Sequence, residues 1–232
     1  MRIKKFFFEK LLLFRNNPRI LLNWGYKFSN FFKENTLNHG ERYDPNILKK
    51  FNLSDPGQEA RYHFVKNYIS LNDTVLDVAC GTGYGTLMLS EECLHITGYD
   101  ISKVAIQYAL KHYKLGTNIN FKQTDIFSIH DHADIVVSFE TIEHVKRDIQ
   151  DTILKLLSLS NKKLICSVPF EESPGVNKHH VHSNINEAAF IFLVEKYKVQ
   201  FFYQSEDGII GKEKKDIQTG SLIVLIDKSS QT

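Results

Sequence analysis

Two glutamates and a histidine stand close together in the second half of the chain. Glu140, Glu143 and His144 form the pattern Glu-x-x-Glu-His directly after the apolar stretch 133–139. On a turn, or on the first turn of a helix, this spacing places three side chains around one point. Two carboxylates and an imidazole suit a divalent cation such as Mg²⁺, Mn²⁺ or Fe²⁺. The imidazole is also a base that works at neutral pH.

A second group of histidines follows the next apolar run, residues 162–168. His179, His180 and His182 all lie within the segment 177–182. One of them could supply a further ligand to a cation, or a second base. Three alternatives therefore stay open for Glu140, Glu143 and the histidines: a metal site, metal-free proton transfer or positioning, and a purely structural role in shaping a pocket.

A short apolar run that ends in glycines lies in the first half of the chain. Residues 75–86 read VLDVACGTGYGT, so Gly81 and Gly83 come directly after a buried-strand pattern. Glycine tolerates positive φ and has no Cβ, which lets the backbone approach a ligand closely. The helix expected next presents free N–H groups at its start. The pattern predicts a strand, a nucleoside-binding loop and a helix.

An acid at the end of the following apolar run supports this interpretation. Asp100 comes about 20 residues after the glycines, where an ionised carboxylate can accept hydrogen bonds from both hydroxyls of a ribose. Thr86 stands where the third glycine of a dinucleotide fingerprint belongs, and Asp77 lies inside the strand. The loop therefore favours a nucleoside without pyrophosphate over NAD.

Strands and helices alternate regularly from residue 71 onward. This alternation predicts an α/β fold with a doubly wound, mostly parallel, seven-stranded sheet. We expect strands at 74–79, 94–99, 118–122, 133–139, 162–168, 198–204 and 219–226, and helices at 84–92, 102–114, 146–158 and near 186–196. Ligands bind beyond the carboxyl ends of the strands in such sheets, and the candidate residues fall at or near those ends.

With these motifs the chain resembles the class I S-adenosylmethionine-dependent methyltransferases over residues 57–226. The resemblance rests on the motif at 75–83, on Asp100, and on Asp125 after the third strand. It implies S-adenosylmethionine as the cofactor and an antiparallel final pair of strands, the last one inserted into the sheet. The implied cofactor contacts are Asp77, Ala79, Gly81, Gly83, Tyr84, Asp100, Ile101, Asp125, Ile126, Glu140 and Arg61. Arg61 would bind an anionic group, unless it is a solvated surface residue.

The Glu-x-x-Glu-His pattern is similar to that of small-RNA 3′-terminal 2′-O-methyltransferases and ubiquinone-pathway O-methyltransferases. Carried over by position, this similarity implies Glu140, Glu143, His144 and His180 as metal ligands. In the metal-free alternative the catalytic residues are His144, His180 and Glu140, because a hydroxyl acceptor needs a base.

Two further segments point to the acceptor. Residues 40–45 and 59–64 resemble segments of bacterial methyltransferases of surface-polysaccharide synthesis, which implies O-methylation of a sugar, a nucleotide-linked precursor or another small molecule. Base N-methylation is disfavoured, since residues 139–142 read FETI instead of an (N/D)PP(Y/F) turn. The alternatives are RNA 3′-terminal 2′-O-methylation, a non-catalytic cofactor-binding partner subunit, and a nicotinamide dehydrogenase.

Composition sets broad limits on the class of protein. The 232 residues suffice for one α/β domain with an appendage, and the net charge of +2 neither demands nor excludes nucleic acid. We expect a small-molecule or glycan substrate rather than a nucleic acid. The three widely spaced cysteines predict buried thiols in a reducing, cytoplasmic compartment.

The first residues of the chain have a different character. Residues 1–32 combine aromatic, leucine and basic residues in a pattern typical of amphipathic helices. We expect a helical extension and linker over 1–56, followed by the cofactor-binding domain over 57–232. Residues 1–32 could cap the domain, form a homodimer surface or contact the inner face of the membrane.

Overall fold

The computed structural model describes residues 42, 44, 45, 55–214 and 219–229. The chain separates into two units, 1–43 and 44–232, and all that follows concerns the second. The predicted helical extension and linker lie almost entirely outside the described residues, so the expectations for residues 1–32 stay predictions. Among the described residues, no helix combines the length and the apolar character needed to cross a membrane.

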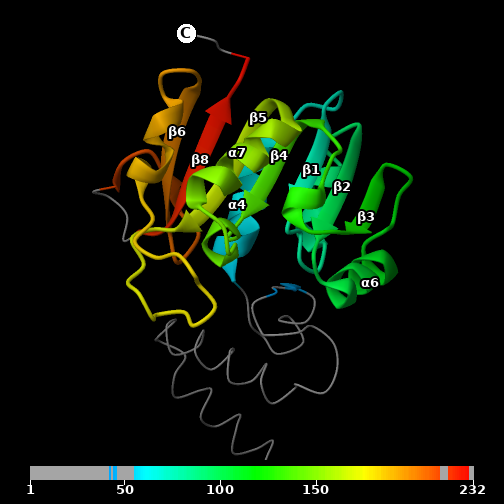
Figure 1. Ribbon diagram of the computed structural model, residues 1–232. Helices are drawn as coiled ribbons and strands as arrows, with labels where there is room; N and C mark the ends of the chain where they lie inside the picture. Colours follow the sequence, from blue (N-terminus) through cyan, green and yellow to red (C-terminus); the bar gives the residue numbers. More distant parts are fainter. Residues whose placement is uncertain (1–41, 43, 46–54, 215–218, 230–232) are drawn as a thin grey trace, which may run out of the picture. The chain divides into compact units, whose positions relative to one another are not determined.

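Within the described residues, eight strands form one mixed sheet (Figure 1), in the order β3-β2-β1-β4-β5-β8-β6-β7. Their bounds are β1 Thr74–Val78, β2 His95–Asp100, β3 Ile119–Gln123, β4 Ala133–Phe139, β5 Ser160–Pro169, β6 Lys198–Ser205, β7 Ile210–Gly211 and β8 Thr219–Asp227. Strands β1 to β5 pair in parallel, and β8 runs antiparallel between β5 and β6. The predicted doubly wound sheet and the inserted final strand are confirmed.

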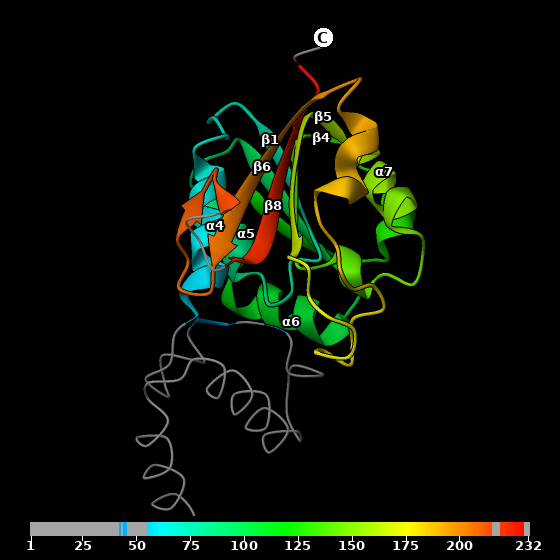
Figure 2. The ribbon, with the colours of Figure 1, turned by 90° about the vertical axis from the view of Figure 1, so that its left-hand side faces the viewer.

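Helices cover both faces of this sheet. Figure 2 shows α4 (Pro56–Lys66) and α5 (Tyr84–Ser90) on one side and α7 (Ile149–Leu159) on the other. Helix α6 (Lys103–His112) packs along β2 and β3. Because both faces are covered, central strands such as β4 are apolar on both sides, and Ile135, Val136 and Val137 are all fully buried. The cysteines Cys80, Cys93 and Cys166 are free and buried, as predicted.

Three details differ from the sequence-based expectation. The connection predicted over 205–219 contains the short strand β7, which pairs with the end of β6 and makes the sheet eight-stranded. Helix α7 starts at Ile149 instead of 146, because the Asp148 side chain accepts hydrogen bonds from two N–H groups of the first turn.

The third difference is the helix expected near 186–196. It is a 3₁₀ helix, η3 (Glu187–Leu193), and two further 3₁₀ turns follow β3 and β4: η1 (Ile126–Ser128) and η2 (Ile142–His144). In η3 the buried residues are Phe190 and Leu193, three positions apart. A 3₁₀ helix repeats every three residues, so this spacing keeps both side chains on the core face.

Helix α4 lies directly on the turn that follows β1. The Tyr62 ring makes edge-on contacts with Tyr84 and Phe139, with ring centroids 5.3 and 5.1 Å apart. Below this ring lies Gly85, where an added Cβ would sit 1.9 Å from the tyrosine Cζ atom. Close packing of α4 on α5 therefore depends on the missing side chain of Gly85.

We predict that Gly85→Ala destabilises the protein by about 1–3 kcal/mol, because the new methyl group overlaps a buried ring. Helix propensity alone would make Gly85→Ala stabilising, so a loss of stability would show that the overlap with the Tyr62 ring outweighs propensity. Urea unfolding measures it. Gly220→Ala is the matched control, since an added Cβ there would meet its nearest neighbours at 3.5 to 3.7 Å. Equal stability of Gly85→Ala and the wild type would contradict the packing described.

Candidate active site

The loop after β1 has an unusual backbone. Ala79, Gly81 and Gly83 have φ values of 63°, 56° and 87°, a region that disfavours side chains. Gly83 forms the N-cap of α5, and an added Cβ there would lie 2.7 Å from Ala109 and from Phe121. The glycines predicted to bind the cofactor thus form a tight loop that is packed from behind by α6 and β3.

Asp100 holds this loop against the end of β2. One carboxylate oxygen accepts a hydrogen bond from the Gly81 N–H at 3.0 Å, and the other accepts one from Ser102 N–H at 2.7 Å. Each carboxylate oxygen can accept a further hydrogen bond, so these contacts are compatible with ribose binding. The adjacent Ile101 is 63% exposed.

The residues after β3 lie next to this position, because β2 and β3 are parallel neighbours. Asp125 is exposed and caps η1 by accepting a hydrogen bond from Phe127 N–H at 2.8 Å. Ile126 packs against the core. The predicted cofactor residues Asp100, Ile101, Asp125 and Ile126 therefore follow two adjacent strand ends.

Asp77 lies fully buried within β1. Thr86 donates a hydrogen bond to its carboxyl group at 2.6 Å, and the Tyr62 hydroxyl lies 3.5 Å from the other oxygen. Burial raises the pKa of Asp77 to about 7, an effect to which the Asp100 charge adds, while the Thr86 and Tyr62 hydrogen bonds oppose it. Near neutral pH this carboxyl group is poised to release a proton when a cation comes close.

Arg61 and Glu140 meet between α4 and the end of β4. Arg61 is 4% exposed, which excludes the solvated alternative, and one of its terminal nitrogens lies 3.6 Å from a Glu140 carboxylate oxygen. The same nitrogen donates to Gln204 at 2.8 Å and to Ser221 at 3.2 Å. Arg61 thus ties α4 to the antiparallel strands as well as to Glu140.

Glu140 has a strained backbone at the position where β4 turns away. Its φ is 48°, and its N–H is held by the Ser167 carbonyl and hydroxyl oxygens, both at 3.1 Å. The Ser167 hydroxyl donates to the Glu140 carboxylate at 2.7 Å. Ser167 and Arg61 both contact this carboxylate, and Glu140 is not part of the donor group formed by the other predicted ligands among the described residues.

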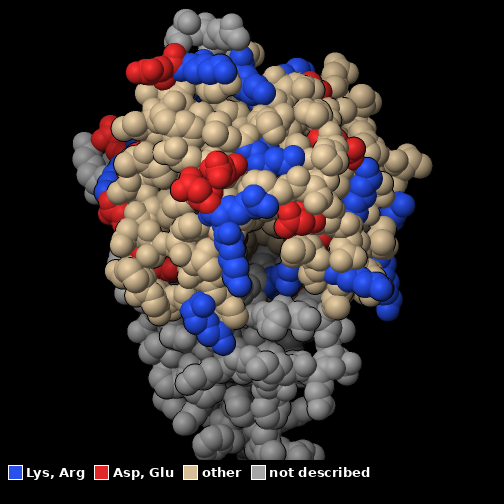
Figure 3. All heavy atoms as spheres, in the orientation of Figure 1, with Lys and Arg blue, Asp and Glu red and all other residues tan. Residues whose placement is uncertain are grey.

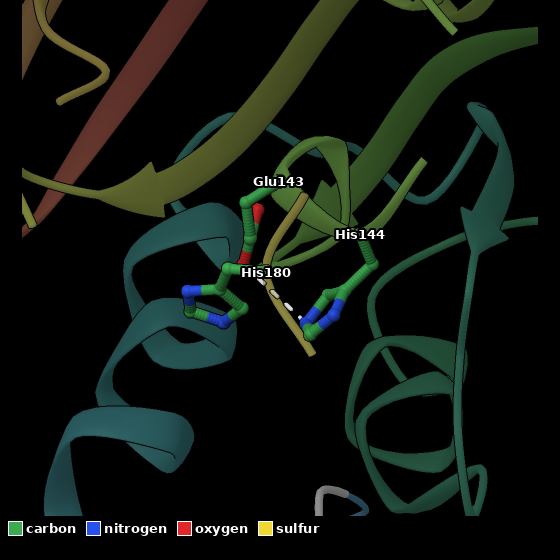
Figure 4. A group of neighbouring side chains, drawn as sticks. All are labelled: Glu143, His144 and His180. Carbon is green, nitrogen blue, oxygen red and sulfur yellow. Dashed lines mark ion pairs between the residues drawn. The ribbon is translucent and has the colours of Figure 1, made fainter. Parts of the chain in front are cut away.

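That donor group consists of Glu143, His144 and His180 (Figure 4). One potential ligand atom from each of these residues lies within 4.8 Å of the other two, and the two imidazole rings meet edge-on with centroids 4.6 Å apart. Glu143 and His144 come from η2, whereas His180 comes from the loop after β5. The structure therefore brings together three of the four predicted ligands and both predicted bases.

Glu143 is the buried member of this donor group. Its residue exposure is 1%, and within the described part of the chain neither carboxyl oxygen has a hydrogen-bond partner. Burial, with a contribution from the Glu140 charge, raises the pKa of Glu143 well above its ordinary value. The Glu143 carboxyl group, whose protonated form is favoured by burial, lies 3.7 Å from the His144 Nε2 atom.

The loop that carries His180 is fixed by backbone hydrogen bonds. Its two ends are joined by Glu171 N–H to Ile185 at 2.9 Å and by Asn184 N–H to Glu172 at 2.8 Å. Its tip is attached to η2, where the Glu143 carbonyl accepts hydrogen bonds from residues 181 and 182 at 2.8 and 3.1 Å. These contacts bring His180 beside His144 across 35 residues of sequence.

Two partners of His180 were not predicted from the sequence. Glu172 is hydrogen-bonded to its Nδ1 atom, and the Asn177 amide lies 3.0 Å from its Nε2 atom. Thr86 and Ser167, which hold Asp77 and Glu140, were also missed. One indication of these contacts was present in the sequence: Asn177 and His180 are three residues apart, a spacing typical of a turn.

Asp77→Asn should remove a pH dependence of stability. Below about pH 4 the wild-type carboxyl is protonated in both the folded and the unfolded protein. Between about pH 4 and pH 7 it ionises in the unfolded protein but keeps its proton in the folded protein, so the wild type becomes progressively less stable as the pH rises. The variant should gain stability relative to the wild type over this range. Urea unfolding of the cofactor-free proteins, with exposed Asp151→Asn as control, measures this difference. Parallel pH profiles for wild type and Asp77→Asn would show that the pKa of Asp77 is the same in the folded and the unfolded protein, and would contradict the raised pKa.

Comparisons with known proteins agree with this geometry. A family model described as a methyltransferase domain matches residues 69–210, more than half of the chain. A ubiquinone biosynthesis O-methyltransferase of Hydrogenovibrio crunogenus is 30% identical, over 47% of this chain and 54% of the relative. The chain thus spans about half the length of that curated relative.

Solved structures share the fold. An N-methyltransferase from Bradyrhizobium japonicum WM9, in complex with S-adenosylhomocysteine, superposes with a TM-score of 0.59 at 18% identity, over 76% of this chain and 90% of that one. Magnesium protoporphyrin IX methyltransferase from Synechocystis PCC 6803 gives 0.57 at 17% identity, over 74% and 84%. The chain therefore belongs to the class I S-adenosylmethionine-dependent methyltransferase domain family.

Proposed function

We propose that this protein transfers the methyl group of S-adenosylmethionine to a hydroxyl group of a small molecule. The observation that carries the proposal is the group of Glu143, His144 and His180 beyond the carboxyl end of β4. Strand β4 lies beside β1, so this group borders the same edge of the sheet as the glycine loop. A hydroxyl acceptor requires a base at such a position, and two imidazoles are present there.

The cofactor supplies a methyl group that is already activated on a sulfonium sulfur. We assign the adenosine part to the loop at Gly81 and Gly83, to Asp100 for the ribose and to Asp125 for the adenine amino group. Asp77 would then face the cationic end of the cofactor. A carboxyl group with a pKa of about 7 ionises readily beside a positive charge, so binding would draw off its proton.

The other half of the site would bind and activate the acceptor. Burial favours the protonated form of Glu143, and in that form its hydroxyl would donate a hydrogen bond to an oxygen atom of the acceptor. One imidazole accepts the proton of the reacting hydroxyl. In-line positioning supplies most of the remaining acceleration, up to ~7–11 kcal/mol.

A divalent cation is a second candidate, because both buried Glu143 oxygens have no hydrogen-bond partner among the described residues. One carboxylate and two imidazoles suit a transition metal, which would lower the pKa of a bound hydroxyl. Burial opposes the ionised form of Glu143 that a cation needs, and Glu140 is held by Arg61 and Ser167. We therefore favour metal-free proton transfer.

For the acceptor we propose a sugar or nucleotide-linked sugar of a surface polysaccharide. Support for the sugar comes from the segments 40–45 and 59–64. The curated relative, a ubiquinone biosynthesis O-methyltransferase, supports methyl transfer to oxygen but not a sugar acceptor. Figure 3 shows basic and acidic side chains interspersed over the face in view. RNA 3′-terminal 2′-O-methylation is the alternative that the test below includes.

We predict that Asp100→Ala weakens S-adenosylhomocysteine binding by about 10- to 100-fold, because the ribose loses a charged acceptor and the glycine loop loses its anchor. Isothermal titration calorimetry measures the change. Asp151→Ala, an exposed acid on α7, is the matched control and should bind as the wild type does. A thermal shift with NAD but none with S-adenosylhomocysteine would contradict the assignment of the cofactor.

We predict turnover of labelled S-adenosylmethionine with at least one nucleotide sugar or glycan fragment, but not with an RNA 3′ end. At least one of His144→Gln and His180→Gln should lower this turnover by about 10²–10⁴-fold, because one of the two imidazoles is the proposed base. Exposed His132→Gln is the control and should leave the rate unchanged.

Loss of activity in the presence of a chelator, restored by added Mn²⁺, would instead establish the metal candidate. Methylation of RNA alone would overturn the proposed acceptor class.

A further inference from the structure

We propose that Gln204 on β6 is a positioning residue for the amino-acid end of the cofactor. It holds the Arg61 side chain by one terminal nitrogen and leaves a second edge of the guanidinium group to bind the cofactor's carboxylate. This inference rests on the proposed function and deepens it, because it extends the cofactor site to the antiparallel strands, which the sequence motifs do not include.

Two hydrogen bonds fix Gln204 against α4. Its amide nitrogen donates to the Gly57 carbonyl at 2.8 Å, and its amide oxygen accepts from Arg61 Nη1 at 2.8 Å. A carbonyl oxygen only accepts and a guanidinium group only donates, so a single orientation of the amide satisfies both partners. Gln204 is 1% exposed, and its partners lie one helical turn apart. It therefore sets the position of α4 as well as that of the Arg61 terminal nitrogen.

Ser221 offers Nη1 a second acceptor, at 3.2 Å. Gln204 and Ser221 are paired residues of β6 and β8, so their side chains lie on the same face of the sheet. The turn after β6 packs closely on the start of α4, where a Cβ added to Gly208 would lie 2.9 Å from the Pro56 carbonyl oxygen. Strand pairing and this packing hold both acceptors in place before any ligand binds.

The contacts of Arg61 are unevenly distributed over its guanidinium group. Among the described residues, the hydrogen bonds and the 3.6 Å contact with Glu140 all involve Nη1. The Nε atom is buried and has no hydrogen-bond partner in the same part of the chain. A buried charged donor without a partner lowers stability, so the arrangement points to a ligand that completes it. Nε–H and the parallel N–H of the other terminal nitrogen form an edge that fits both oxygens of a carboxylate.

Arg61 lies where the amino-acid end of the cofactor is expected. Strand β1 has β2, which carries Asp100, on one side and β4 on the other. A cofactor with its ribose at Asp100 therefore extends its amino-acid end toward β4, where Arg61 meets Glu140. The next residue of α4, Tyr62, contacts Tyr84 at the glycine loop. Arg61 and Glu140 carry opposite charges, as do the carboxylate and ammonium groups of that end.

Isothermal titration calorimetry with two ligands tests the inference. S-adenosylhomocysteine carries the carboxylate, and decarboxylated S-adenosylhomocysteine lacks only this group. Gln204→Met, which removes both hydrogen bonds at nearly constant volume, should weaken binding of the first ligand about 3- to 10-fold and leave the second unchanged. Gln200→Met on the same strand is the matched control, because the Gln200 side chain makes no hydrogen bond among the described residues.

A double substitution tests whether Gln204 acts through Arg61. Arg61→Lys should weaken S-adenosylhomocysteine binding about 10- to 100-fold, because the paired donors are lost. Adding Gln204→Met to Arg61→Lys should then cost little more, since both changes affect one contact. If Gln204→Met does not fold, Ser221→Ala removes the other acceptor of Nη1 and should weaken only S-adenosylhomocysteine, by about 2- to 3-fold.

The outcomes separate this inference from the proposed function. Equal losses for the two ligands would mean that Gln204 serves stability alone, and they would overturn the inference while the cofactor assignment stands. Additive effects of Gln204→Met and Arg61→Lys would overturn it as well. If the wild type bound neither ligand, the proposed function would fail, and the role of Gln204 would fail with it.

Discussion

The candidate site depends on the hydrogen bonds that hold the buried carboxyl group of Asp77. It joins three elements: β1, which carries it, α5 through Thr86, and α4 through the Tyr62 hydroxyl. Burying a carboxyl group without hydrogen-bond partners would lower the stability of the folded protein. These contacts therefore also help to hold the glycine loop between β1 and α5 in place. The raised pKa of Asp77 reflects the cost of burying its charged form.

Helix α4 connects the two halves of the site. Tyr62 lies over the glycine loop, and its neighbour Arg61 reaches Glu140 at the end of β4. Glu140 in turn is held to β5 by Ser167, in a left-handed backbone conformation that starts the turn toward Glu143 and His144. A displacement of α4 would therefore disturb both the cofactor loop and the acceptor side, which is a physical reason for burying an arginine there.

The proposed acceptor side brings a buried carboxyl group and two imidazoles together in a small space. Burial raises the pKa of Glu143, while Glu172 and the His179 carbonyl contact the Nδ1 atoms of His180 and His144. Carboxyl groups whose pKa is shifted by burial are typical of functional sites.

The sequence by itself determined the fold class, the positions of the main strands and the glycine loop, because each depends on local patterns such as apolar runs and glycines at strand ends. The inserted final strand followed from the family resemblance. The sequence also indicated that Glu143, His144 and His180 could meet. Only the tertiary structure separated Glu140 from them, through Arg61 on α4 and Ser167 on β5, and only it placed Glu172 and Asn177 on His180. These contacts join segments whose proximity is set by sheet pairing and loop closure, and no spacing along the chain encodes them.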